Sequence, residues 1–193
     1  MAEPKVGKRW RIADHDPVSA SALALALGVS PLLAHLLIRR GCATREAAQA
    51  FLDAPVSALH DPWSMAGMPV AVARLQRAVA GQEPILVCGD YDVDGVTGMA
   101  LLVSGLRRAG ADVSYAVPNR LEHGYGLPSE IVEQAAAAGV RLLVTVDHGI
   151  TAVEATRLAR DRGLDVIICD HHLPPPVLPP ATAILNPRQA DCD

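Results

Sequence analysis

Two different patterns of hydrophobic and polar residues divide the chain near residue 82. Before this point, apolar residues recur at helical spacing in alanine- and leucine-rich segments that show no strand-like alternation. The spacing, together with capping residues and terminal glycines, predicts helices at residues 18–27, 31–40, 44–52 and 69–80. We therefore expect residues 1–82 to form a small helical lead-in.

After residue 82, short apolar runs alternate with alanine-rich segments of ten residues or more. The runs predict strands at residues 85–89, 112–116, 142–146 and 165–169, with helices at 96–109, 128–138 and 151–162 between them. Nearly continuous apolar runs are typical of parallel strands that are buried on both faces. Right-handed crossovers then predict an α/β fold with a doubly wound, mainly parallel sheet over residues 83–193.

Residues 19–38 form an uncharged run that could imitate a targeting or membrane segment. Gly28, Pro31 and His35 interrupt this run, and acidic residues precede it. Such interruptions favour two short core-facing helices over a single membrane span. We expect no membrane partner.

Composition narrows the classes of function. Aromatic residues make up only 3% of the 193 residues, too few to build platforms that stack nucleic acid bases. The 17 Lys and Arg against 21 Asp and Glu give a net charge of −4, which argues against a general polyanion-binding surface. If nucleic acid binds, contacts to its backbone must dominate, and bound cations would have to supply positive charge.

The four cysteines show no Cys-x-x-Cys pair, so reduced cytoplasmic thiols are the simplest interpretation.

Acidic and histidine residues follow three of the predicted strands. They are Asp-Tyr-Asp-Val-Asp-Gly at 90–95, Asp-His-Gly at 147–149 and Asp-His-His at 170–172. Because ligands of an open parallel sheet bind beyond the carboxyl ends of its strands, we expect these side chains to converge at one edge.

Several aspartates in one crevice would repel one another unless a cation neutralised them. Carboxylate oxygen mixed with imidazole nitrogen suits Mn²⁺ or Zn²⁺, and two ions about 3.5–4 Å apart could activate a water and clamp a phosphoryl group. The alternative for any single aspartate is an ordinary helix cap. All three clusters together favour a metal centre.

The polar, glycine-containing segment 118–128 follows a predicted strand, where a substrate loop would lie. Arg120 and His123 could contact phosphate oxygens, and glycines such as Gly124 would let the backbone approach closely. An ordinary surface loop is the alternative. The chain has no Gly-x-Gly-x-x-Gly, Gly-x-Ser-x-Gly or Walker-type motif.

Four ordered motifs resemble those of the DHH phosphoesterase superfamily, and more narrowly of its bacterial single-strand-specific DNA exonucleases. They are Gly-Asp-Tyr-Asp-Val-Asp-Gly at 89–95, Arg-Leu-Glu-His-Gly-Tyr-Gly at 120–126, Val-Asp-His-Gly at 146–149 and Asp-His-His at 170–172. The resemblance implies metal ligands at Asp92, Asp94, Asp147 and His171. It implies that Asp147 bridges two ions, that His172 lies near the scissile phosphate, and that Asp170 holds the histidine pair. It places Arg120, His123 and Gly124 in a loop near substrate phosphate.

The resemblance further implies a cytoplasmic, Mn²⁺- or Mg²⁺-dependent 5′→3′ exonuclease that acts on single-stranded DNA in repair and recombination and releases 5′-mononucleotides. A single-strand-binding protein and a helicase would be its partners. Alternatives are a phosphodiesterase for oligonucleotides or cyclic dinucleotides, and an inactive binding module with the same fold.

The sequence departs from the superfamily pattern in two places. Cys88 stands where many members carry a histidine, which puts one ligand or the preferred metal in doubt. The pattern also continues beyond Asp193, to another metal-binding aspartate and further domains. We therefore expect a DHH domain truncated at its C-terminal end, in a fragment that is weakly active or inactive alone.

Overall fold

A computed structural model describes residues 16–119, 121, 124–190 and 192. The chain divides into two compact units, residues 1–59 and 60–193. The first unit is helical and the second contains a sheet, and each is described by itself.

The first unit contains α1 (Pro17–Leu27), α2 (Pro31–Arg39), α3 (Arg45–Asp53) and a short 3₁₀ helix, η1 (Val56–Ala58). The three α-helices begin at side chains that accept hydrogen bonds from backbone N–H groups of the first turn, namely Asp16, Ser30 and Thr44. Small and branched side chains such as Ala34 and Leu37 form the unit's core, whereas Leu25 and Leu32 are exposed. The two helices expected over residues 19–38 are therefore present, but they bury only part of their apolar surface.

No single helix among the described residues has both the length and the apolar character of a membrane span. Helices α1 and α2 meet those criteria only when taken together, and the chain bends by 110° between them.

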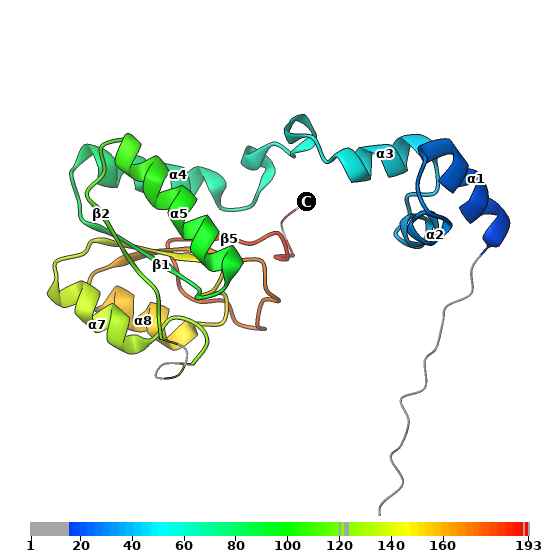
Figure 1. The fold of residues 1–193 in the computed structure, drawn as a ribbon. Helices are drawn as coiled ribbons and strands as arrows, with labels where there is room; N and C mark the ends of the chain where they lie inside the picture. Colours follow the sequence, from blue (N-terminus) through cyan, green and yellow to red (C-terminus); the bar gives the residue numbers. More distant parts are fainter. Residues whose placement is uncertain (1–15, 120, 122–123, 191, 193) are drawn as a thin grey trace, which may run out of the picture. The chain divides into compact units, whose positions relative to one another are not determined.

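The second unit is a five-stranded sheet in which every pairing is parallel (Figure 1). Its strand order is β2-β1-β3-β4-β5. The strands are β1 (Ile85–Gly89), β2 (Val113–Ala116), β3 (Leu142–Val146), β4 (Asp165–Cys169) and β5 (Ala183–Leu185). The helices are η2 (Pro62–Ser64), α4 (Met68–Ala80), α5 (Val93–Arg108), α7 (Ser129–Ala137) and α8 (Val153–Asp161). The predicted α/β fold with a doubly wound parallel sheet is confirmed.

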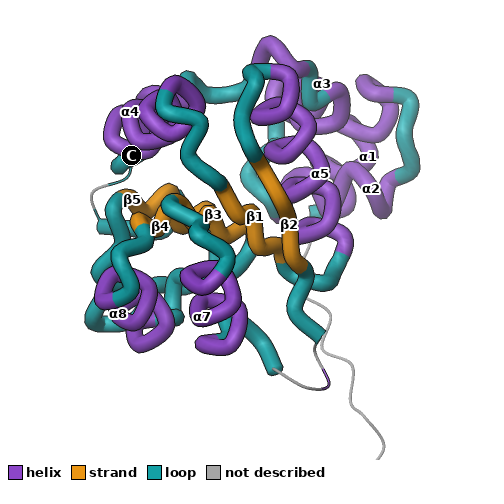
Figure 2. Tube along the Cα trace, turned by 90° about the vertical axis from the view of Figure 1, so that its left-hand side faces the viewer, coloured by secondary structure: helices purple, strands orange, loops and turns teal. Residues whose placement is uncertain are grey.

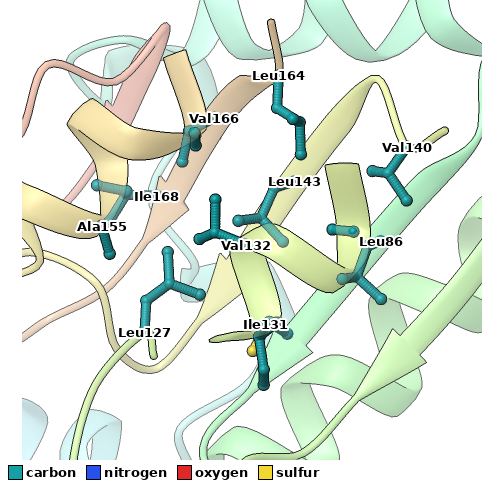
Figure 3. Close-up of a cluster of buried hydrophobic side chains, with 13 residues drawn as sticks. Leu86, Leu127, Ile131, Val132, Val140, Leu143, Ala155, Leu164, Val166 and Ile168 are labelled. Carbon is teal, nitrogen blue, oxygen red and sulfur yellow. The ribbon is translucent and has the colours of Figure 1, made fainter. Parts of the chain in front are cut away.

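Helices α4 and α5 cover one face of the sheet, and α7 and α8 cover the other (Figure 2). Alternate residues of each strand belong to opposite cores, because successive side chains point to opposite faces. In β1, Val87 packs in the core under α4 and α5, while Leu86 packs in the core under α7 and α8. Figure 3 shows Leu143 of β3 and Val132 of α7 together in that second core. Burial on both faces explains why the strands are apolar throughout.

Helix α4 belongs to the sheet unit, although the sequence pattern assigned it to the helical lead-in of residues 1–82. Its Ala71 and Ala78 are buried in the core under α4 and α5. Its buried Arg74 forms ion pairs with Glu83 at 2.6 Å and with Asp165 at the start of β4. The division between units therefore lies near residue 60. An amphipathic pattern gives a helix an apolar face without specifying which core that face covers.

Strand β5 was not predicted. It has only three residues and follows a proline-rich segment, so it shows no alternation from which a strand could be inferred. Helix α5 begins at Val93, three residues before the predicted start, because Asp92 caps it.

Candidate metal centre

The candidate site lies where the chain leaves neighbouring strands β1 and β3 toward opposite faces of the sheet. The segment after β1 enters α5 on one face, and the segment after β3 leads to α8 on the other. A crevice at such a switch point is the usual ligand position in an open α/β sheet. The three predicted motifs therefore begin at the edge where a ligand would bind.

One aspartate in each motif continues the sheet by one residue. The backbone N–H of each donates to a carbonyl of the next strand: Asp90 to Val146 at 3.1 Å, Asp147 to Cys169 at 2.8 Å and Asp170 to Leu185 at 3.0 Å. These bonds hold the three residues in a row along the carboxyl edge. All three are also buried.

The turn between β1 and α5 fixes the first acidic motif. The Asp92 side chain accepts the N–H of Asp94 at 3.0 Å and that of Gly95 at 3.1 Å, and these bonds lower the pKa of Asp92. A Cβ atom on Gly95 would lie 2.4 Å from the Asp90 carbonyl oxygen and 2.5 Å from the Asp90 nitrogen. Glycine is therefore required for α5 to pack directly on the turn.

Replacing Gly95 with alanine is expected to destabilise the chain by about 1–3 kcal/mol and to weaken metal binding, because backbone atoms of the turn would have to move. Gly105, on the exposed side of the same helix, provides the matched control, since a Cβ there meets nothing within 4 Å. Gly105→Ala should instead stabilise the chain by about 0.5–1 kcal/mol. Urea unfolding measures both effects. Equal effects of the two substitutions would contradict this account of Gly95.

Asp147 links two groups of potential ligands. Asp90, Asp92 and Asp147 each offer an oxygen atom, and the three lie within 4.8 Å of one another. An oxygen atom of Asp147 also lies within 4.8 Å of nitrogen atoms of His171 and His172, which form the second group. The His171 Nε2 is 2.9 Å from the Asp147 Oδ1. Asp147 adopts a left-handed backbone conformation, with φ of 66°, at the start of the turn after β3.

The charges of this group are unbalanced without a cation. Burial raises the pKa of Asp147, and the neighbouring Asp92 raises it further, although His171 partly offsets the shift. Asp94 opens onto the same hollow, which Asp147, Asp170 and His171 also line. Carboxylate oxygens and imidazole nitrogens are a suitable donor set for Mn²⁺ or a similar divalent ion. The residues present therefore fit a metal centre.

Asp170 organises the histidine pair. Its Oδ1 accepts the backbone N–H of His171 at 2.7 Å, that of His172 at 3.1 Å and lies 2.7 Å from the His172 Nδ1. Its Oδ2 accepts the N–H of Ile150 at 2.9 Å. Burial alone would raise the pKa of Asp170, but these hydrogen bonds to the carboxylate outweigh it and lower the pKa. Asp170 is therefore held as a buried anion behind the two imidazoles.

Cys88 and His148 are next to the acidic motifs or within them, but neither belongs to the two groups of potential ligands among the described residues. Cys88 packs in the core under α7 and α8, and burial raises the pKa of its thiol to about 12. His148 is fully buried, and burial lowers its pKa.

The structure brings most of the predicted site residues together. Asp92, Asp147, Asp170, His171 and His172 meet at one edge, and Asp94 lines the adjoining hollow. Arg120 and His123 lie outside the described residues. Gly124 is exposed with φ of 75°. The catalytic, metal-binding and substrate-binding roles of all these site residues stay predictions.

The prediction omitted two residues of the site, Asp90 and Tyr125. Asp90 was visible in the sequence as the first of three alternating aspartates, yet the pattern does not show which of them point inward. The Tyr125 hydroxyl lies 3.0 Å from the His172 Nδ1, a contact across 47 positions. Only its place in the loop after β2 hinted at this contact.

Comparison with known proteins identifies related chains. The profile of the DHH family, N-terminal domain, matches residues 84–193. The single-stranded-DNA-specific exonuclease RecJ of Bacillus subtilis is 40% identical over 184 residues, covering 95% of this chain and 23% of the relative. The Escherichia coli protein of the same name is 44% identical over 165 residues, covering 84% of this chain and 28% of the relative. The chain thus spans about a quarter of the length of these relatives.

A solved structure, that of RecJ from Thermus thermophilus in complex with Mn²⁺, superposes with a TM-score of 0.69 and 33% identity. The superposition covers 96% of this chain and 26% of that one. The match therefore extends over nearly the whole chain.

Proposed function

Because the chain belongs to the DHH family, we propose that it is part of a metal-dependent exonuclease that degrades single-stranded DNA. The observation that carries this proposal is the meeting of Asp92, Asp147 and His171 at the switch point of the sheet. The relatives named as single-stranded-DNA-specific exonucleases supply the substrate class. We extend the proposal to hydrolysis in the 5′→3′ direction, release of 5′-mononucleotides and a role in cytoplasmic DNA repair and recombination.

Asp92, Asp94, Asp147 and His171 would hold the metal, and Asp90 lies close enough to join them. When bound, Mn²⁺ or Mg²⁺ would neutralise phosphoryl oxygens and lower the pKa of a water molecule. The residues of the chain provide the arrangement around that chemistry. Asp147 faces both the carboxylates and the imidazoles, so it is suited to a bridging position.

His172 is suited to contact the phosphate at the scissile bond. Asp170 engages its Nδ1, and among the described residues no carboxylate hydrogen-bonds the Nε2, which lies 3.4 Å from the Tyr125 hydroxyl. The loop that contains Arg120, His123 and Gly124 would bind adjacent phosphates, since guanidinium and imidazole groups donate to phosphate oxygens. Net charge of −4 leaves little fixed attraction for DNA elsewhere on the chain. We therefore propose that residues 1–193 alone are weakly active or inactive, and that a single-strand-binding protein and a helicase assist the full-length enzyme.

Digestion of end-labelled oligonucleotides by the full-length protein tests this function. With Mn²⁺, we expect single-stranded DNA to be degraded in preference to duplex DNA, with mononucleotides released first from the 5′ end. Chelation by EDTA should abolish the reaction. Preference for dinucleotides or cyclic dinucleotides would instead assign a short-substrate phosphodiesterase, and binding of DNA without hydrolysis would assign an inactive module.

A further inference from the structure

Tyr125 touches the candidate catalytic edge from a loop that is distant in sequence. Its hydroxyl lies 3.0 Å from the His172 Nδ1 and 3.4 Å from the Nε2. The same hydroxyl is 3.5 Å from the backbone carbonyl oxygen of Asp147. One oxygen atom therefore lies beside both His172 and the turn that presents Asp147.

The two rings pack edge to face. Their centroids are 5.5 Å apart and their planes are inclined by 73°. His172 also packs against His171, with a centroid separation of 4.6 Å. The His172 imidazole thus contacts two rings and the Asp170 carboxylate, while its side chain stays 43% exposed.

Hydrogen-bond chemistry limits what the Tyr125 hydroxyl can do. The Asp170 carboxylate can only accept, so the His172 Nδ1 carries the proton that joins them. A protonated Nδ1 cannot also accept the Tyr125 proton, so the hydroxyl can donate only to the Nε2 at 3.4 Å or to the Asp147 carbonyl oxygen at 3.5 Å. Burial and the surrounding carboxylates raise the pKa of Tyr125, which keeps the phenol neutral.

We propose that Tyr125 is a positioning residue for His172 that holds its imidazole against Asp170. This inference deepens the proposed nuclease function and rests on it. The hydroxyl forms the third member of a chain that runs from Asp170 through His172 to Tyr125. The Tyr125 hydroxyl also reaches the turn after β3 through the Asp147 carbonyl, so this residue contacts segments that follow two neighbouring strands, β3 and β4.

Steady-state kinetics of Tyr125→Phe in the full-length protein, with Mn²⁺ and single-stranded DNA, test the proposal. Phenylalanine keeps the edge-to-face packing and removes only the hydroxyl. Losing a positioning hydrogen bond should lower kcat by about tenfold, while KM stays within about twofold because the interaction contributes to the reacting geometry. Tyr115→Phe on β2, where the exposed ring is outside the site, is the matched control and should leave both constants unchanged.

The outcomes separate this role from substrate binding and from folding. A raised KM with unchanged kcat would show that the hydroxyl binds DNA, and two unchanged constants would show that it does nothing; either result overturns the proposal. Urea unfolding of Tyr125→Phe should match the parent. A large loss of stability would make the residue structural and likewise overturn it.

Nitrogen-15 NMR of the metal-free chain provides a readout that does not depend on activity. We expect the His172 ring to show one tautomer protonated at Nδ1, and expect Tyr125→Phe to shift or broaden those signals, which a His172→Gln variant would assign. An unchanged His172 spectrum would overturn the positioning role. If the parent protein has no nuclease activity but the NMR change occurs, the proposed function fails and the contact to His172 stands.

Discussion

Asp147→Asn is expected to lower kcat/KM of the full-length protein on single-stranded DNA by roughly a thousandfold, equivalent to about 4 kcal/mol of transition-state stabilisation. Asp147 belongs to both ligand groups, so its replacement weakens both at once. Asparagine keeps the shape of the side chain but not its charge. Gel analysis of labelled oligonucleotides in Mn²⁺ measures the effect.

The same substitution should stabilise the metal-free chain, raising its Tm by about 2–4 °C. Burial and Asp92 raise the pKa of Asp147, so its charged form costs stability once the pH exceeds the carboxyl's ordinary value near 4. Asparagine also tolerates the positive φ of 66°. Activity lost together with higher stability excludes unfolding as the cause.

Asp161→Asn, an exposed carboxylate at the end of α8, is the control for loss of one negative charge. It should change neither activity nor Tm. Full activity in Asp147→Asn, or an equal loss in Asp161→Asn, would contradict the assignment of Asp147 to the metal centre.

Asp170→Asn is expected to damage both stability and catalysis, with a loss of about 2–4 kcal/mol in the free energy of unfolding and at least about a hundredfold in kcat. The buried carboxylate accepts three backbone N–H groups and contacts the His172 Nδ1. The side-chain NH2 group of asparagine would replace one carboxylate oxygen. It would then face N–H groups that need an acceptor. Urea unfolding and single-turnover kinetics measure the two effects.

The pH dependence of Asp170 has the opposite sign to that of Asp147. Its hydrogen bonds lower the pKa of Asp170 in the folded chain, so its stabilisation is present above the ordinary carboxyl pKa near 4. That stabilisation is lost as the pH falls through the lowered folded-state value. The difference in unfolding free energy between the parent and Asp170→Asn should therefore shrink in acid. A difference that stays constant from neutral pH to about pH 2 would contradict the role of its charge.

The sheet could be predicted closely because its strands are buried on both faces. The bounds expected for β1, β3 and β4 agree with the structure. Burial on both faces leaves an apolar run that is visible without knowledge of its neighbours. Strand β5 has two half-buried residues out of three, so its sequence carries too little pattern.

The convergence of the acidic motifs could be predicted for the same reason, since all parallel strands present their carboxyl ends at one edge. Which of the alternating aspartates points inward could not be predicted, because it depends on how closely Gly95 lets α5 pack on Asp90. The place of Tyr125 depends on the path of a loop across the sheet edge. Contacts of that kind have no local signature in the sequence.

The central claim, that three strand ends form one metal centre, is tested most directly by titrating Mn²⁺ into the chain and measuring the free ion by electron paramagnetic resonance. We expect saturable binding by the parent and by Asp161→Asn, and loss of that binding in Asp147→Asn. Absence of saturable binding by the parent, or equal binding by Asp147→Asn, would contradict the claim.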